Sequence, residues 1–479
     1  MTLKLNSQYT DLGHQFSRRN LPAKTTKPVT LLWNSELATQ LSIELPETSK
    51  AAYFSGTKLF EGSKPTSMVY AGHQFGHFNP QLGDGRAHLL GELIDQKGTV
   101  HELHLKGSGA TPYSRNGDGK CGIKPAVREF IMSEALYAMG VPTTRSLSVV
   151  ATGEPLMRQD LTTGAVVTRV AQSHTRVGTF EYFAARGMHA EIEVLTDLCI
   201  NRHFNNIDKN SPSKYINLLS EVIDKNVKLT TEWMRIGFIH GVLNTDNTLL
   251  SGETIDFGPC AMMGAYNPST VFSSIDHKGR YAYGNQSSII QWNMARLAEC
   301  LIPLIDKNEK KAIDTVMPLL VNFEKKYQDS YHQMMSKKLG FDKSQQLPEA
   351  LLNDLLESMF NNQLDYTLTF VSLMDSLGDG NLAPPQLKLW HENWLNGLAA
   401  CEITTEMAQK TMIHSNPIVI PRNHHIETVL KTTEESLNDL AAKEYIKVLK
   451  SPYLSIKDTS KYQTIDAKSD LTYETYCGT

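Results

Sequence analysis

Apolar side chains recur at three- and four-residue intervals through most of the second half of this chain, which is the spacing of an amphipathic helix. The pattern therefore predicts a mostly helical C-terminal portion. The helices expected from it span residues 217–238, 289–304, 310–339, 348–360, 385–399 and 404–413. From Asp458 onward the chain is polar and has no such period. We expect a mobile tail over residues 458–479.

The first half of the chain contains strand patterns. Residues 91–107 alternate between apolar and polar side chains and are interrupted by Gln96-Lys97-Gly98. This arrangement predicts a β-hairpin whose second strand ends at Lys106. Other elements expected here are a short helix over residues 35–41, a helix from Pro125 to Gly140 and a strand over residues 165–170. A proline in the first turn and a glycine after the last turn are typical helix boundaries.

Two glycine-rich loops flank the predicted hairpin. The first, residues 68–91, contains Gly83-Asp84-Gly85-Arg86, and the second, residues 107–122, contains Gly117-Asp118-Gly119-Lys120. Glycine lets backbone N–H groups approach phosphate, and a guanidinium can bind phosphate through two hydrogen bonds. We predict nucleotide contacts from the two loops, namely from Gly83, Gly85, Arg86, Asp118 and Gly119. Ordinary Asp-Gly turns with solvated basic side chains are the alternative.

The run from His240 to Gly258 carries the most specific chemistry. Asn247 lies nine residues before Asp256, which begins an Asp-Phe-Gly sequence. Protein-kinase-like folds use an asparagine and an aspartate at this spacing to hold magnesium on a nucleoside triphosphate. We expect the two residues to come from short strands that face each other across a hairpin.

The proton acceptor of an ordinary kinase is missing from the same run. It would lie two residues after His240, where this chain has Val242, and valine cannot take a proton. The nearest carboxylate belongs to Asp246. Three interpretations stay open: a kinase that uses Asp246 as its base, a nucleotide-binding scaffold without catalysis, and different chemistry on the same nucleotide.

Charged residues of the strands and helix complete the predicted site. Lys106 would contact phosphate and pair with a carboxylate on the following helix. We prefer Glu129, in the first turn, and expect Glu134 to be a surface or hinge residue. Arg169 and Arg176 are predicted to clamp phosphate oxygens, and the alternative for each is a surface salt bridge.

Composition narrows the class of protein. The chain has 479 residues, of which 41% are hydrophobic and 20% charged, with a formal net charge of −4. This balance gives no reason to expect nucleic acid or an acidic membrane as a partner. The first residues have no apolar core of a secretory signal, and no apolar stretch is long enough to span a bilayer. We expect a cytoplasmic monomer.

The six cysteines are scattered without a Cys-x-x-Cys pair, and the sixteen histidines form no metal-ligand set. The sequence therefore predicts neither a disulfide framework nor a zinc site. Cys477 differs from the other cysteines because it lies in the expected tail, and it is the candidate for a redox role.

Several short sequences together resemble the selenoprotein O family of pseudokinases. They occur in the family's order and spacing from about residue 10 to residue 479, and they comprise residues 72–76, 81–86, 104–107, 111–115, 169–176, 240–247 and 292–297. The resemblance implies an α+β fold with two lobes, as in protein kinases. It also implies ATP bound in a flipped orientation and transfer of AMP to Ser, Thr or Tyr of proteins with release of pyrophosphate. Bacterial members are also associated with manganese-dependent UMP transfer from UTP.

The resemblance assigns a role to each matching residue. Gly83, Gly85, Arg86 and Lys106 would contact phosphate, with Glu129 orienting Lys106. Asp118, Gly119, Arg169 and Arg176 would also contact the nucleotide. Asn247 and Asp256 would hold Mg²⁺ or Mn²⁺, and Asp246 would accept the proton.

The resemblance also implies a division of the chain. We expect an N-terminal extension over residues 1–60, an N-lobe over 61–180, a helical C-lobe over 181–457 and the tail over 458–479.

Two positions depart from the family pattern. The tail cysteine of many bacterial relatives can bond to a cysteine in the segment after Asp-Phe-Gly, but Phe272 lies at the matching position here. Cys260 is an alternative partner for Cys477. Phe257 stands where relatives often have tyrosine, which should not affect the metal.

Overall fold

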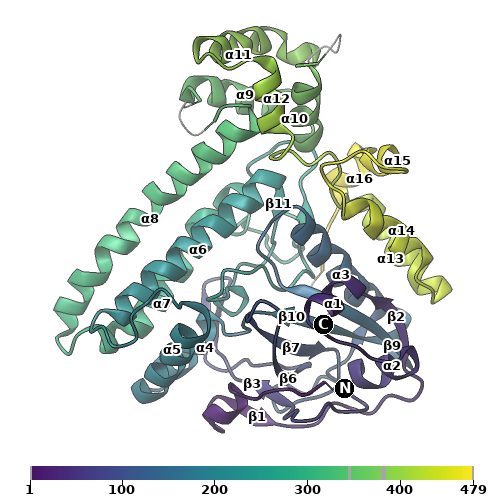
Figure 1. Ribbon diagram of the computed structural model, residues 1–479, viewed down its shortest axis with the longest axis vertical. Helices are drawn as coiled ribbons and strands as arrows, with labels where there is room; N and C mark the ends of the chain where they lie inside the picture. The colour runs from purple at the N-terminus through teal and green to yellow at the C-terminus, as the bar shows by residue number, and fades with distance from the viewer. Residues whose placement is uncertain (1–2, 343–346, 379–383, 477–479) are drawn as a thin grey trace.

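The computed structural model describes residues 3–342, 347–378 and 384–476 of the chain (Figure 1). Its N-terminal part is built on an eight-stranded antiparallel sheet with the strand order β1-β3-β6-β7-β10-β9-β2, in which β8 also pairs with β10. The strands are β1 (Ser17–Arg19), β2 (Val29–Trp33), β3 (Thr66–Met68), β6 (Ala87–Ile94), β7 (Val100–Lys106), β8 (Cys121–Gly122), β9 (Arg145–Met157) and β10 (Leu161–Ala171).

Side chains of the sheet alternate between two apolar clusters because successive strand residues point to opposite faces. Val166 of β10 belongs to the cluster that contains Leu37 of α1 (Ser35–Gln40) and Phe54 of α2 (Glu47–Phe54). Its neighbour Val167 belongs to the other cluster, which continues into α3 (Ile123–Ala138) and the helical part of the chain. The sheet is therefore covered on both faces, and α3 lies between it and the remaining helices.

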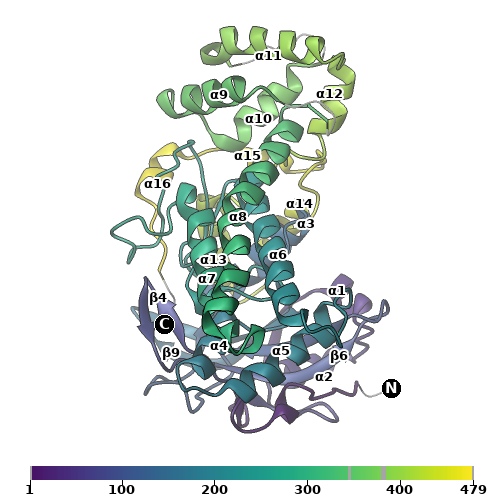
Figure 2. The same cartoon turned by 90° about the vertical axis from the view of Figure 1, so that its left-hand side faces the viewer.

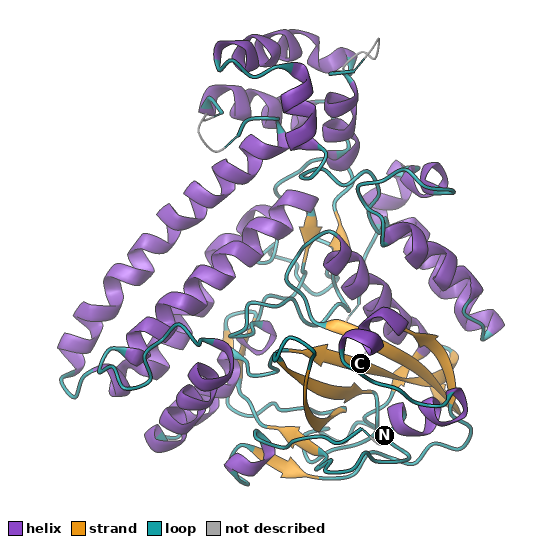
Figure 3. Ribbon diagram, in the orientation of Figure 1, coloured by secondary structure: helices purple, strands orange, loops and turns teal. Residues whose placement is uncertain are grey.

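Helices make up most of the chain after β10, and Figure 3 shows the strands concentrated in the N-terminal part. Three long helices, α6, α7 and α8, pack side by side, and α9 to α12 form a group at the end of α8 (Figure 2). The helices are α4 (Val177–Ala184), α5 (His189–His203), α6 (Lys214–Ile236), α7 (Gln286–Ile305), α8 (Glu309–Lys338), α9 (Glu349–Asn361), α10 (Tyr366–Asp375), α11 (Lys388–Ala400), α12 (Thr405–Met412), α13 (Asn423–Ser436), α14 (Leu440–Leu449), α15 (Thr459–Gln463) and α16 (Ala467–Thr472). The mixed helix-and-sheet class that the sequence predicts is confirmed.

The expected hairpin is present as β6 and β7, and the six helices predicted after residue 216 correspond to α6, α7, α8, α9, α11 and α12 within a few residues. The 13-residue strand β9 was not predicted. Seven helices after β10 were not predicted, namely α4, α5, α10, α13, α14, α15 and α16.

The expectation that Asn247 and Asp256 lie on paired strands is wrong. Asn247 ends the 3-10 helix η2 (Thr245–Asn247), and Asp256 has a φ of +65°, which no strand residue adopts. The paired strands are β11 (Phe238–Ile239) and β12 (Ala261–Met262), which flank the run on either side.

The expected mobile tail is also wrong for its described part. Residues up to Tyr476 include α15 and α16, and the Tyr473 hydroxyl accepts a hydrogen bond from buried Arg128. The Thr475 N–H donates to the Phe272 carbonyl at 2.8 Å, and Thr475 forms a parallel bridge with Ser273. The sequence pattern did not predict these contacts, because they are made by isolated residues that do not recur at a regular interval. Cys477 lies outside the described residues.

Candidate functional site

Both glycine-rich loops open onto one pocket. Its volume is about 280 Å³, and its lining includes Gly83, Gly85, Arg86, Asp118, Gly119 and Asp246. The first loop connects β5 (His77–Asn79) to β6, and the second connects β7 to β8. The fold therefore brings all five predicted loop residues to the same cavity as the candidate proton acceptor.

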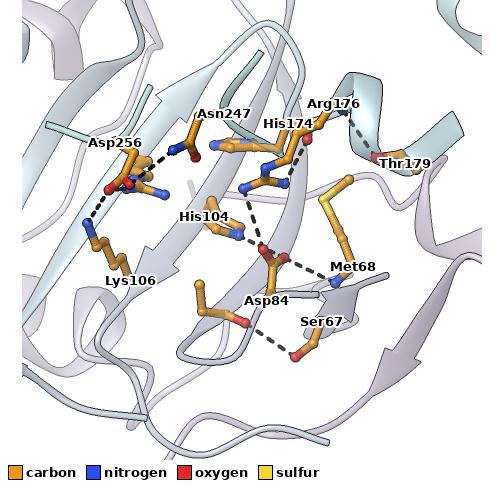
Figure 4. A network of polar contacts seen from close by, with 12 residues as sticks. Ser67, Met68, Asp84, His104, Lys106, His174, Arg176, Thr179, Asn247 and Asp256 are labelled. Carbon is orange, nitrogen blue, oxygen red and sulfur yellow. Dashed lines mark hydrogen bonds and ion pairs between the residues drawn. The ribbon is translucent and has the colours of Figure 1, made fainter. Parts of the chain in front are cut away.

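Asp84 anchors the first loop, although the sequence analysis assigned this residue no role. The buried Asp84 carboxylate accepts a hydrogen bond from the Met68 N–H and contacts His104 Nε2, both at 3.1 Å (Figure 4). Burial alone would raise the pKa of Asp84, but His104 and Arg176 hold that pKa well below its usual value. The loop is thus anchored by a buried charge and is no free turn in solvent.

A cluster of four charged side chains lies beside the loop. Lys106 Nζ lies 2.7 Å from Glu129 Oε2 and 3.3 Å from Asp256 Oδ1. Arg169 donates from Nε to Glu129 Oε1 and from NH2 to Glu129 Oε2, and its NH2 lies 3.9 Å from Asp256 Oδ1. The pairing of Lys106 with Glu129 that we preferred is present.

Glu134 differs from its expectation. It is buried and binds Arg145 through two hydrogen bonds of 2.7 Å, so it is no surface residue.

Asn247 and Asp256 meet although they lie on loops. The Asn247 amide nitrogen donates to the Val242 carbonyl at 3.1 Å and lies 3.5 Å from Asp256 Oδ2 (Figure 4). Burial would raise the pKa of Asp256, but Lys106 and Arg169 outweigh this effect and keep the group ionised.

The pair fits a divalent cation. Because the Asn247 amide nitrogen donates to the Val242 carbonyl, the Asn247 amide oxygen is left as an acceptor beside the Asp256 carboxylate. Mg²⁺ and Mn²⁺ prefer oxygen ligands. No group of three or more His, Cys, Asp or Glu residues suited to a metal occurs in the described part of the chain. An ion held by this pair would therefore need further ligands from substrate phosphate and water.

Asp246 is buried at the wall of the pocket. Its Oδ2 accepts a hydrogen bond from Gln74 Nε2 at 3.2 Å, and its Oδ1 has no hydrogen-bond partner among the described residues. Burial raises the pKa of Asp246 to about 7. A carboxylate of this kind can take up a proton near neutral pH, because its ionised form is poorly solvated.

A small hairpin formed by β4 (Gly72–Gln74) and β5 carries Gln74 to Asp246, and sequence reasoning missed its role. On the opposite side of β4, His73 Nδ1 lies 2.5 Å from the Glu181 carboxylate, which also accepts from the Thr245 hydroxyl. The hairpin is thereby fixed to the loop that contains Asp246. The run Gly-His-Gln-Phe-Gly over residues 72–76, which is one of the sequences that carry the family resemblance, was the available signal.

The two predicted arginine clamps are already engaged by carboxylates. Arg169 is bound by Glu129, and Arg176 lies 3.6 Å from Asp84 and 4.4 Å from the centre of the Tyr70 ring. Asp118 is paired with Arg158 at the exposed edge of the second loop. Asp118 lines the pocket, whereas Arg169 and Arg176 are not part of its lining, and the roles of all three residues toward a nucleotide stay predictions.

The predicted redox contact remains untested. Cys260 is buried, and its thiol donates to the Phe257 carbonyl at 3.3 Å. Burial raises the pKa of the Cys260 thiol to about 12, which makes it a poor nucleophile.

The structure combines glycine loops that line a pocket with a buried lysine–glutamate pair and an adjacent asparagine–aspartate pair. These are features of enzymes that act on nucleotides. The family model described as "Protein adenylyltransferase SelO" matches residues 1–450. The chain is 47% identical to the protein nucleotidyltransferase YdiU of Teredinibacter turnerae, 44% identical to that of Clostridium beijerinckii and 43% identical to that of Pseudoalteromonas translucida. These alignments cover 98% or more of each chain. The protein belongs to the SelO family of protein adenylyltransferases.

No helix in the described ranges is both long enough and apolar enough to cross a membrane.

Proposed function

We propose that the protein transfers AMP from ATP to a Ser, Thr or Tyr hydroxyl of protein substrates, with UTP and UMP transfer as the second candidate. Membership of the SelO family supports nucleotide transfer as the reaction class. The names of its relatives, protein nucleotidyltransferase, support a protein as the acceptor. We also infer a two-lobe, kinase-like organisation, with residues 61–180 as one lobe and residues 181–457 as the other.

In the proposed reaction the substrate hydroxyl oxygen attacks the α-phosphorus of the nucleotide. A new oxygen–phosphorus bond forms, the bond from the α-phosphorus to the bridging oxygen breaks, and pyrophosphate leaves. The hydroxyl proton passes to Asp246. Its unpartnered Oδ1 and its pKa of about 7 support this role, because the group can accept a proton and release it again near neutral pH.

The remaining residues would position and neutralise the phosphates. Asn247 and Asp256 would hold Mg²⁺ or Mn²⁺, which supplies positive charge against the phosphate oxygens when bound. Lys106 would contact phosphate while Glu129 fixes its position, and backbone groups of Gly83 and Gly85 would line the phosphate path.

The observation that carries the proposal concerns the position of the proton acceptor in the loop that contains Val242 and Asp246. Val242 is buried where a kinase would have its base, whereas Asp246 lines the pocket. This favours different chemistry over γ-phosphate transfer. The intact Asn247–Asp256 pair speaks against a scaffold that has lost catalysis.

The test uses purified protein, Mn²⁺ or Mg²⁺ and a bacterial lysate, with ATP labelled at either the α or the γ phosphate. We expect label in protein only from α-labelled ATP, and none with Asp256→Ala. Asp246→Asn, which keeps the side-chain volume, should lower the rate by a factor on the order of 10² to 10⁴. Label from γ-labelled ATP would make the protein a kinase, and no label from either nucleotide would favour the scaffold.

A further inference from the structure

A basic and aromatic surface lies beside the β4–β5 hairpin, on the side away from Gln74. It consists of Phe78 from β5, Arg280 from the segment before α7, and Trp292 and Arg296 from α7; we call it the Arg280–Trp292 surface. The Phe78 side chain is 40% exposed, and the other three residues are half-buried. None of these residues has a part in the nucleotide chemistry proposed above.

Trp292 organises this surface. The guanidinium carbon of Arg280 lies 5.0 Å from the centre of the Trp292 ring, and that of Arg296 lies 4.9 Å from it. His73 meets the same ring edge-on at 5.1 Å and contacts Phe78 at 4.9 Å. Stacking on an aromatic ring fixes the direction of a guanidinium while its hydrogen-bond donors remain free to bind an anion.

Arg280 forms no salt bridge with any carboxylate of the described residues, although its guanidinium donates a hydrogen bond to the hydroxyl of the neighbouring Tyr281. Its Nε is buried without a hydrogen-bond partner in the same part of the chain. A half-buried guanidinium that lacks a carboxylate is incompletely compensated, because burial removes water from its donors. An anionic group from outside the chain would complete these interactions.

The acidic residues nearby are already committed. Glu299 pairs with Arg296 at 2.6 Å. The Asp276 carboxylate accepts from the backbone N–H groups of Arg280 and Tyr281 at 2.9 and 2.7 Å. Lys278, His77 and His277 are exposed around the same hairpin and segment, so the region as a whole is basic.

The surface is tied to the site of proton transfer by a short chain of hydrogen bonds. The Phe75 N–H lies 3.1 Å from both the Asn244 side-chain oxygen and the Tyr281 hydroxyl, and that hydroxyl donates to Asn244 at 2.6 Å. Asn244 lies two residues before Asp246, and Tyr281 directly follows Arg280. The preceding residue of the hairpin, Gln74, hydrogen-bonds to Asp246 itself. The segment that carries Arg280 is therefore connected by hydrogen bonds to the loop that carries Asp246.

We propose that the Arg280–Trp292 surface binds an acidic side chain of the protein substrate and so selects hydroxyls that have an Asp or Glu nearby. This inference rests on the proposed function and specifies its substrate class. The acid would occupy one of the positions near the modified hydroxyl in the peptide. The exposed Phe78 ring would favour an apolar residue beside that acid.

The test measures AMP transfer from α-labelled ATP to synthetic peptides that share one acceptor hydroxyl. The peptides carry Asp, Asn, phosphoserine or Lys at each neighbouring position in turn, and the enzymes are wild type, Arg280→Gln, Arg280→Lys and Lys278→Gln. Lys278 is the matched control because it is an exposed cation two residues away in the same segment.

We expect wild type to prefer Asp over Asn at one position by about tenfold in kcat/KM, mainly through KM, as one charge-assisted contact provides. Arg280→Gln should lose this preference, so that the Asp and Asn peptides react equally. Arg280→Lys should keep part of it, and Lys278→Gln should keep all of it. Equal loss of preference in Lys278→Gln would assign the effect to the general basic field and overturn the specific role of Arg280.

Two further outcomes separate this inference from the proposed function. If wild type labels peptides without any preference for an acid, the inference fails while nucleotide transfer stands. If wild type labels no protein or peptide from α-labelled ATP, the proposed function itself fails. Phosphoserine preferred well above Asp, and lost in Arg280→Gln, would assign the surface to phosphorylated substrates and overturn selection of a carboxylate. A melting temperature of Arg280→Gln within about 2 °C of wild type would exclude misfolding as the cause.

Discussion

Substitutions of buried glutamates on α3 should show which of them affects activity as well as stability, and the cluster around Glu129 is the test case. Glu129 is buried and binds two buried cations, Lys106 and Arg169. In Glu129→Gln both cations remain, and Asp256 is the remaining carboxylate of the cluster. We expect a less stable protein with a misplaced Lys106.

The structure sets the size of the stability loss. Burial would raise the pKa of Glu129, but Arg169 and Lys106 lower that pKa from 4.5 to about 2. At 1.36 kcal/mol per pH unit this fall corresponds to about 3 kcal/mol of stability at neutral pH. The cost of leaving buried charges without a partner, about 3–5 kcal/mol, has the same size. Because the pKa is lowered in the folded state, the contribution is present above about pH 4.5 and disappears as the pH falls toward 2.

Glu134→Gln is the matched control because Glu134 lies on the same helix and forms an equally buried pair with Arg145. Urea denaturation at pH 7 should show a loss of about 3 kcal/mol in both variants. AMP transfer should fall about 10²-fold only in Glu129→Gln, since a displacement of about 1 Å in a positioning group has this effect. Equal activity of the two variants would refute the role of Glu129 in orienting Lys106.

Two further perturbations test the burial of a carboxylate outside the site and the wall around Asp246. Burial raises the pKa of Glu253 to about 7, so folding favours its protonated form and wild type should lose stability as the pH rises from 4.5 through 7. Glu253→Gln should lose less stability over this range. Identical melting temperatures of wild type from pH 5 to 8 would contradict the assignment. In Gly72→Ala the added methyl group would lie 2.6 Å from Asp246 Oδ1. We expect kcat to fall at least tenfold with an unchanged Kd for ATP, because the carboxylate must move. The control is Gly397→Ala in α11, where the methyl group would lie 3.7 Å from its nearest neighbours, and equal kcat values in the two variants would contradict the proposed position of Asp246.

The sequence by itself determined the elements that repeat a local pattern. The hairpin that ends at Lys106 and the helices of the second half follow from periods of two and of three to four residues, which depend only on neighbours along the chain. The sequence also showed the spacing of Asn247 and Asp256 and the absence of a base at Val242, because these residues lie within one short run. We expected Lys106 to pair with Glu129 because the helix starts directly behind the glycine loop, and the pair is present although Glu129 lies in the second turn of α3.

Only the tertiary structure decided which distant residues meet. No local pattern shows what Asp84, Gln74 and Glu181 contact, yet they fix the glycine loop and the wall around Asp246 through contacts across 16 to 172 residues. The positive φ of Asp256 and the packing of the C-terminal segment against Phe272 depend on surrounding atoms in the same way. Burial is the physical reason, because a carboxylate's pKa and its partners depend on the water that other parts of the chain exclude.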